Sequence, residues 1–429
     1  MAAGSKGAEK RLRVLVVRGS FAQLGGAERE LLQLLRNVDQ RWDVGLATLE
    51  FPEHARSLIE GADINVYSLD APFEWPRGAA AEVLASSSKK TAKAWKDVDI
   101  PFQNYDAVHL SVCPGTLEIL PRIPAGLPVH YHCLEPPRWL YEDLLHRRLD
   151  GTLKRPLWLT NLIFSLQRRR DKAYVRRLIA RPHATLSGNS PWIQQWISEL
   201  YGVASSPTKA NGEPPERDAH HRLTEATHVL NVIDLESWPQ HPTDDEQTAL
   251  EEAPATPAEY VVTVGQVIHA KGAWSTVESL KDTGLGLVQV GGGREEDKQA
   301  LVQRGKAIGV EVVCMPRLSQ AALRAIIRGS RAMVSHARRE PFGLTPIEAM
   351  AIGVPALMVN ESGFADTMAA SDSGRLIERS DLGAWKAAYL DAKDPQLRQQ
   401  WAEAGRPYVE ARFSMQVQIE ALERLLVVH

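Results

Sequence analysis

The segment Glu340–Pro355 (EPFGLTPIEAMAIGVP) carries the most informative arrangement of chemical groups in the sequence. Two glutamates, Glu340 and Glu348, bracket a glycine turn followed by Thr345 and Pro346. Threonine as N-cap, proline at the first helical position and Glu348 at the third predict a helix with a capping box. Free amides at a helix start and the positive end of its dipole favour an anion. The segment therefore predicts an anion-binding turn beside two carboxylates, the alternative being a helix cap and a solvated glutamate.

A second candidate is the turn VGQVIHAKG, residues 264–272. A predicted strand ends at Gly265, and Lys271 follows six residues later. A lysine in such a turn can neutralise the charge of a leaving phosphate group, whereas the alternative is a lysine solvated at the surface. Gln266, directly after the glycine, can donate hydrogen bonds but supplies no charge.

Glycines also follow two other predicted strands. Gly25 and Gly26 lie between the first predicted strand and the first predicted helix, and Gly291 follows a strand in the second half. Glycine at such a turn lets the backbone approach a ligand closely, although many such turns only connect elements. We interpret both turns as candidate ligand contacts.

Polar side chains gather around one more predicted strand, 129–133. His130 and His132 lie two residues apart and so face the same side of the strand, where either can approach a ligand or be a buried structural histidine. Glu135 and Arg138 follow within a few residues and are candidate contacts for an acceptor or a phosphate.

The elements that position these groups alternate between short β-branched runs and helical patterns. This alternation predicts βαβ units and an α/β fold with two doubly wound parallel sheets. In such sheets ligands bind beyond the carboxyl ends of the strands, so two facing sheets form a cleft. The predicted strands are 14–18, 44–49, 64–68, 107–112, 129–133, 185–187, 228–233, 260–264, 285–290, 310–314, 332–335 and 354–359.

Polar, proline-containing stretches divide the chain. They predict an N-terminal Rossmann-like domain over 1–240 with a surface insertion at about 204–225, a linker over 241–258, and a C-terminal domain over 259–410. Residues 411–429 are predicted to form a helix that packs back on the first domain.

The composition excludes several classes of protein. Of 429 residues, 44% are hydrophobic and 24% charged, which is typical of a globular chain and not of a disordered or fibrous one. The net charge of −3 gives no support for nucleic-acid binding. Three cysteines without a Cys-x-x-Cys pair oppose a disulfide framework or a zinc site and favour a reducing compartment. No apolar run of about 18 residues occurs, so we expect no membrane-spanning helix.

One region is unbalanced in charge. Between Arg147 and Arg181 there are eleven Lys and Arg residues against two acids, together with short apolar runs. A basic surface backed by apolar groups can hold anionic lipid headgroups, which predicts peripheral membrane contact. The alternative is the solvated face of an ordinary helix.

The segment around Glu340 and Glu348 resembles the donor-site motif of retaining, nucleotide-sugar-dependent glycosyltransferases of family 4 (glycosyl transferases group 1), which have the GT-B fold. That motif consists of two glutamates eight positions apart around a Phe-Gly loop. Supporting segments occur in the expected order, so the resemblance covers nearly the whole chain. They are LGGAERELLQLL (24–35), EPPRWLYE (135–142), VGQVIHAKG (264–272), LVQVGGG (287–293), SGF (362–364) and FS (413–414).

The resemblance implies roles for matching residues. Glu340 would hydrogen-bond the donor sugar, and Glu348 the ribose hydroxyls. Backbone amides would cradle the sugar and the diphosphate, and they belong to Phe342, Gly343, Leu344 and Thr345. The implied donor site also contains Gly25, Gly26, Gly265, Gln266, Lys271 and Gly291. His132, Glu340 and Lys271 are the implied catalytic residues. The family usually has arginine where this chain has Gln266, and relatives often have histidine where it has Leu134.

The resemblance further implies a retaining, hexosyltransferase-like enzyme of glycan biosynthesis. It would move a sugar from a nucleotide diphosphate sugar to a hydroxyl of a glycan or lipid-linked acceptor. We expect it to need no cofactor beyond the donor and no divalent metal, and to be cytoplasmic or peripheral on the cytoplasmic membrane face. One alternative is a non-catalytic GT-B homologue that binds nucleotide sugar or lipid, which Gln266 and Leu134 favour. The other is a nucleotide-sugar epimerase.

Overall fold

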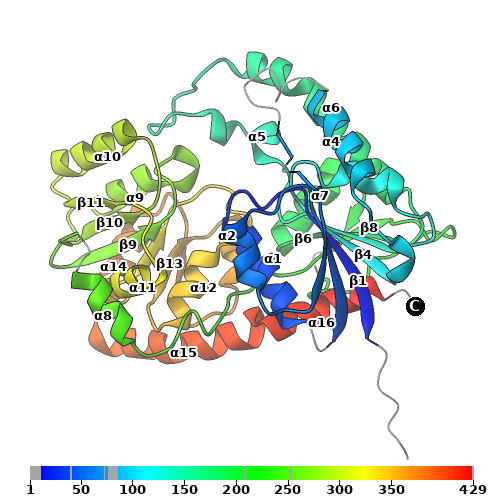
Figure 1. Cartoon of the computed structure of the whole chain (residues 1–429). Coiled ribbons are helices and arrows are strands. Elements are labelled where there is room, and N and C mark those ends of the chain that lie inside the picture. Colours follow the sequence, from blue (N-terminus) through cyan, green and yellow to red (C-terminus); the bar gives the residue numbers. More distant parts are fainter. Residues whose placement is uncertain are drawn as a thin grey trace, which may run out of the picture.

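The computed structural model describes residues 11–38, 41–71, 73–75, 86–206, 208–251 and 254–427. Two parallel sheets flanked by helices stand side by side (Figure 1). The first sheet has the strand order β3-β2-β1-β4-β5-β6-β8-β7 and the second β11-β10-β9-β12-β13-β14. The predicted α/β fold with two doubly wound sheets is confirmed.

The central strands of the first sheet are buried on both faces, and the first of them is a nearly continuous apolar run. In β1, Val14 and Val16 join the apolar cluster under α1, while Leu15 and Val17 join the cluster on the other face. The strands are β1 (Leu12–Val17), β2 (Trp42–Ala47), β3 (Ile64–Tyr67), β4 (Ala107–Ser111), β5 (Val129–His132), β6 (Ala184–Gly188), β7 (Ala204–Ser205) and β8 (Glu225–His228). The helices are α1 (Gly26–Asn37), α2 (Glu53–Arg56), α4 (Ser86–Asp97), α5 (Arg138–Tyr141), α6 (Leu157–Ile179) and α7 (Pro191–Tyr201).

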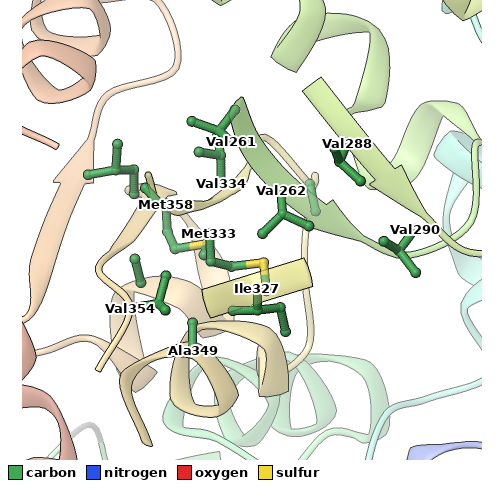
Figure 2. Packing of buried hydrophobic residues seen from close by; sticks show 14 of the residues in the cluster. Val261, Val262, Val288, Val290, Ile327, Met333, Val334, Ala349, Val354 and Met358 are labelled. Carbon is green, nitrogen blue, oxygen red and sulfur yellow. The ribbon is translucent and has the colours of Figure 1, made fainter. Parts of the chain in front are cut away.

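The second sheet has its core between the strands and the surrounding helices. Figure 2 shows Val262 close to Met333 and Ile327, whereas its neighbour Val261 points to the other face of the sheet, beside Val334. Its strands are β9 (Tyr260–Val264), β10 (Gly286–Val290), β11 (Val312–Met315), β12 (Met333–Ser335), β13 (Ala356–Val359) and β14 (Gly374–Ile377). The helices that follow or precede them are α8 (Asp244–Glu251), α9 (Ala273–Ser279), α10 (Glu295–Ala307), α11 (Gln320–Gly329), α12 (Leu344–Ala351), α13 (Ser362–Thr367) and α14 (Leu382–Asp391).

Two long helices end the described chain and join the domains. Helix α15 (Pro395–Phe413) runs along the second domain, and α16 (Met415–Leu426) continues beneath the first (Figure 1). Ile419, Leu422 and Leu425 of α16 are buried in the apolar cluster that contains α1. The terminal helix therefore packs back on the first domain, as predicted.

Two segments differ from their predictions. The stretch expected to be a linker contains α8, whose Glu246 is buried and accepts hydrogen bonds from Nε of Arg324 (2.7 Å) and Nε of Arg328 (2.9 Å). The strand predicted at 228–233 lies earlier, at β8, because only that stretch pairs with β6 and β7. Among the described residues no helix has the length and apolarity to cross a membrane.

Candidate active site

The two domains face each other across a cleft of about 1850 Å³. Its walls are the carboxyl ends of parallel strands and the turns that follow them, which is where α/β sheets bind ligands. Val112 and Leu134 follow the strands β4 and β5 of the first sheet, and Val264, Val290 and Ser335 end strands of the second.

An ion pair lies on the C-terminal wall of this cleft. Lys271 sits on a single helical turn (His269–Lys271) after β9, and its Nζ donates to Glu340 Oε2 at 2.8 Å and Oε1 at 3.1 Å. The Glu340 side chain is 16% exposed. Burial alone would raise the pKa of Glu340, but the charge and hydrogen bond of Lys271, with Arg138 nearby, outweigh burial and lower that pKa. Glu340 is therefore held as a carboxylate.

Helix α12 begins next to this pair, two residues earlier than predicted. Gly343, not Thr345, is the N-cap, with φ of +97°, and no side chain caps the helix. The predicted capping box at Thr345 is therefore wrong. A Cβ on residue 343 would lie 2.5 Å from Cδ1 of Phe364, so the left-handed turn and the close contact both require glycine. Phe342, Gly343, Leu344 and Thr345 line the cleft, where a helix start offers unpaired amides.

Glu348 lies on α12 and lines the cleft one turn beyond this start. Burial raises the pKa of the Glu348 carboxyl to about 7. The pKa values of the two glutamates thus shift in opposite directions, because Glu340 is paired with Lys271 and Glu348 is affected by burial alone.

The glycine turns meet at the cleft. A Cβ on Gly26 would lie 3.1 Å from Cδ1 of Leu344, so the first helix of one domain faces the start of α12 in the other. On the C-terminal wall Gly291 packs on Gly265, where an added Cβ would come within 2.2 Å of the Gly265 carbonyl oxygen. Gln266 lines the cleft beside them. The structure therefore brings the predicted glycines, Gln266 and Lys271 into one space.

Glu135 and Arg138 line the same cleft from the first domain. Burial raises the pKa of Glu135 to about 7 although Arg138 opposes that effect. Nε of Arg138 donates to Oε2 of Glu142 at 2.7 Å, and its Nη2 donates to the carbonyl of Arg338 in the opposite domain at 3.2 Å. Arg138 therefore bridges the two walls, and Oε2 of Glu135 is buried without a hydrogen-bond partner.

His132 lies elsewhere. It faces a small second cavity under α1 and α16, while Leu134 occupies the wall of the main cleft. Its Nδ1 shares the Ser187 hydroxyl with His130 at 2.8 Å, and burial lowers the pKa of His132 to about 3. His130 and His132 do face the same side, but that side is covered by helices. The geometry gives no support to His132 as a group that orients the sugar.

Arg18 and Arg317 are two of the cleft residues that the sequence did not predict. Arg18, at the end of β1, is buried and ion-paired with Glu28, and its Nη1 donates to Oγ of Ser111 at 3.0 Å. Arg317, after β11, donates from Nη2 to the carbonyl of Leu24 across the cleft at 3.1 Å. An arginine at a strand end is a weak signal, because most are surface residues. Among the described residues no cluster of three His, Cys, Asp or Glu side chains suits a metal ion.

Comparisons with known proteins agree with this geometry. Residues 245–407 match the family model described as glycosyl transferases group 1. The chain is 27% identical over 120 residues to the alpha-1,3/1,6-mannosyltransferase alg-2 of Neurospora crassa, covering 27% of this chain and 26% of that protein. It is 35% identical over 88 residues to the capsular polysaccharide biosynthesis glycosyltransferase CapM of Staphylococcus aureus, covering 20% of this chain and 23% of that protein. The chain thus spans about a quarter of the length of these curated relatives.

A solved structure extends the likeness to the whole fold. HepE from Anabaena, in complex with UDP and glucose, aligns over 97% of this chain and 99% of its own with a TM-score of 0.62 and 15% identity. The likeness to solved structures, the two facing sheets and the cleft between them show the GT-B fold, and residues 245–407 of the second domain match the glycosyl transferases group 1 family.

Proposed function

We propose that the protein transfers a sugar from a nucleotide diphosphate sugar to an acceptor hydroxyl, with retention of anomeric configuration and without a metal ion. The observation that carries this proposal is the Lys271–Glu340 pair beside the start of α12 in a cleft between two α/β domains. A cation next to free helix amides is suited to a diphosphate leaving group.

In this proposal each part of the donor meets a different group. The diphosphate lies against Lys271 and the amides of Phe342 to Thr345, which hold the charge that develops as the glycosidic bond breaks. Glu340 accepts hydrogen bonds from the sugar hydroxyls, and Glu348 from the ribose hydroxyls. The departing phosphate takes the acceptor proton, so the enzyme needs no strong base of its own. Closure of the domains keeps water, a competing acceptor, away from the donor.

The test is a panel of nucleotide sugars with released nucleotide as the readout, with and without acceptors. We expect at least one donor to raise the melting temperature and to support release. Glu340→Gln should lower turnover while nucleotide binding persists, since the carboxylate faces the sugar. Full turnover in Glu340→Gln, or failure of every donor to shift the melting temperature, would contradict the proposal.

A second candidate is a non-catalytic protein that binds nucleotide sugar. Gln266 favours it, because a neutral amide replaces the charge that the family usually has beside Lys271. Stoichiometric donor binding without nucleotide release in any acceptor mixture would support this alternative over transfer.

We further propose that the acceptor is lipid-linked and that the first domain docks on an anionic membrane at the cytoplasmic face. Helix α6 exposes an apolar row at its start: Trp158 is 67% and Leu162 64% exposed, with Leu166 one turn further. Basic residues follow in the same helix, and one of the two acids in the region, Asp171, is turned inward to Tyr141 and Tyr201. Anionic headgroups complement such a face.

The position of α6 links this surface to the proposed reaction. Phe164, Gln167, Arg170 and Tyr174 on its other side line the cleft. A lipid-linked acceptor held at the exposed row would therefore present its headgroup to the donor without leaving the bilayer.

Vesicle flotation tests this docking. The wild type should float with vesicles containing about a third anionic phospholipid and not with purely neutral vesicles. The double variant Trp158→Ser/Leu162→Ser should lose flotation. Leu382→Ser/Leu390→Ser removes two equally exposed leucines (58% and 62%) from α14 in the other domain and should float normally. Equal flotation of both double variants would refute the assignment of this surface.

A further inference from the structure

The segment that carries Glu340 accepts hydrogen bonds from the opposite domain. It crosses from β12 to α12 as Arg338-Arg339-Glu340-Pro341. Nη2 of Arg138 donates to the carbonyl of Arg338 at 3.2 Å, and Oγ of Ser190, just before α7, donates to the carbonyl of Pro341 at 2.7 Å. Both flanks of Glu340 are therefore tied to the first domain.

The side chain of Arg339 makes the most extensive of these contacts. Its Nε donates to Oε1 of Glu142 at 2.7 Å, and Glu142 is only 3% exposed. Its guanidinium also lies 5.1 Å and 5.0 Å from the ring centroids of Trp192 and Trp196 on α7. An arginine stacked on aromatic rings and ion-paired with a buried carboxylate has its position well defined.

The backbone of Arg339 is held in an unfavourable conformation. Its φ is +50°, in the left-handed region that residues other than glycine rarely adopt. Such a conformation persists where surrounding contacts impose it. The backbone on either side is held within the second domain, by Arg338 N donating to the Ala270 carbonyl at 2.7 Å and Gly363 N donating to the Glu340 carbonyl at 2.8 Å. The contacts of the Arg339 side chain itself come from the first domain, so separating the domains removes these contacts from the turn.

We propose that Arg339 is a positioning residue: its contacts with Glu142, Trp192 and Trp196 form when the domains close, and they place the neighbouring Glu340 for the sugar. Arg339 itself does not line the cleft, whereas Glu340 and Pro341 do. Lys271, the other partner of this segment, belongs to the same domain as Glu340, so the Lys271–Glu340 ion pair does not depend on domain closure. Arg339 thus couples the approach of the first domain to the geometry of the donor carboxylate. This role rests on the proposed function, in which Glu340 contacts the donor sugar.

The test compares Arg339→Ala with a matched control. Arg375→Ala removes an arginine of the same domain with similar exposure (49% against 45%), an ion pair to Asp391 at 2.8 Å and a ring contact 5.6 Å from Trp401. Arg375 lies on β14, outside the cleft lining. Arg339→Lys keeps the charge and serves as the conservative variant.

Two readouts are needed. Hydrogen exchange of the peptide covering 338–345 should speed up in Arg339→Ala and stay unchanged in Arg375→Ala. Turnover should fall roughly 10- to 100-fold in Arg339→Ala, because a small displacement of a positioned group is enough for such a loss. The dissociation constant for free nucleoside diphosphate should stay close to that of the wild type, and Arg339→Lys should recover part of the turnover.

Each outcome decides something. Unchanged exchange at 338–345 in Arg339→Ala overturns the proposal, as does equal loss of turnover in Arg375→Ala. A parallel loss of turnover and of nucleotide affinity would make Arg339 a binding residue instead. If the wild type transfers no sugar from any donor, the proposed function fails, while the exchange comparison still decides whether Arg339 holds the Glu340 segment.

Discussion

Replacing Lys271 by alanine removes the direct partner of the Glu340 carboxylate and the cation proposed to face the diphosphate. The lysine makes two charge-assisted hydrogen bonds, at 2.8 Å and 3.1 Å. Loss of one charge-stabilising donor from an active site costs about 2.7–4 kcal/mol in the transition state, or roughly 10²- to 10³-fold in kcat. The lysine is 34% exposed, so the accompanying loss of folding stability is smaller, about 1–2 kcal/mol.

The same substitution should change the pH dependence. In the wild type the lowered pKa of Glu340 means that the ion pair stabilises the fold above the ordinary carboxyl pKa and loses that contribution as the pH falls through the lowered value. Without Lys271, burial dominates and raises the pKa of Glu340. The acid limb of the turnover profile should therefore move to higher pH in Lys271→Ala.

The assay is nucleotide release at saturating donor over a pH series, with calorimetric binding of nucleoside diphosphate in parallel. Lys271→Arg keeps the charge and should lose less than Lys271→Ala. Turnover of Lys271→Ala within about threefold of the wild type, with an unmoved acid limb, would refute the role given to this lysine.

Three further predictions concern the donor site. Burial raises the pKa of Glu348 to about 7, and a carboxylate accepts hydrogen bonds better than a protonated carboxyl group. The affinity for nucleotide sugar should therefore rise about tenfold between roughly pH 6 and 8. Glu348→Gln should abolish this pH dependence, measured by calorimetry. Gly343→Ala should destabilise the second domain by about 1–3 kcal/mol, seen as a lower melting temperature, because alanine there is both left-handed and in collision with Phe364; an unchanged value would contradict this. Gln266→Arg should tighten nucleoside diphosphate binding by about 1.5–3 kcal/mol, more at low salt, and no gain would place residue 266 away from the phosphates.

The sequence predicts the sheets well because buried parallel strands leave a strong local signal. The run Tyr260–Val264 is apolar, β-branched and followed by glycine, and the strand has those bounds. Long-range ion pairs leave no such signal. Glu246 lies in an acidic, proline-rich stretch that is typical of a linker, yet it is buried between two arginines of α11 that are more than 70 residues away in sequence.

The site shows the same division between local and distant information. Each of the turns around Lys271 and Gly343 is short, so residue spacing predicted each turn by itself, and the family resemblance implied that the two lie in one site. For His132 the strand period correctly pairs it with His130 but does not say whether the cleft or a helix covers that face. Arg339 has no pattern at all, because its partners come from the other domain.

The charges on the cleft walls imply an exchange of partners when the donor binds. On the C-terminal wall the positive charge of Lys271 is already balanced by Glu340, and Gln266 is neutral. The positive end of the α12 dipole adds only about half an elementary charge. A diphosphate that draws Lys271 toward itself leaves the Glu340 carboxylate short of hydrogen bonds in a buried site, which is costly unless another donor replaces the lysine. The sugar hydroxyls are that replacement. A nucleoside diphosphate without a sugar cannot supply them, so we expect the intact donor to bind more tightly than its own leaving group, and Glu340→Gln to remove that difference.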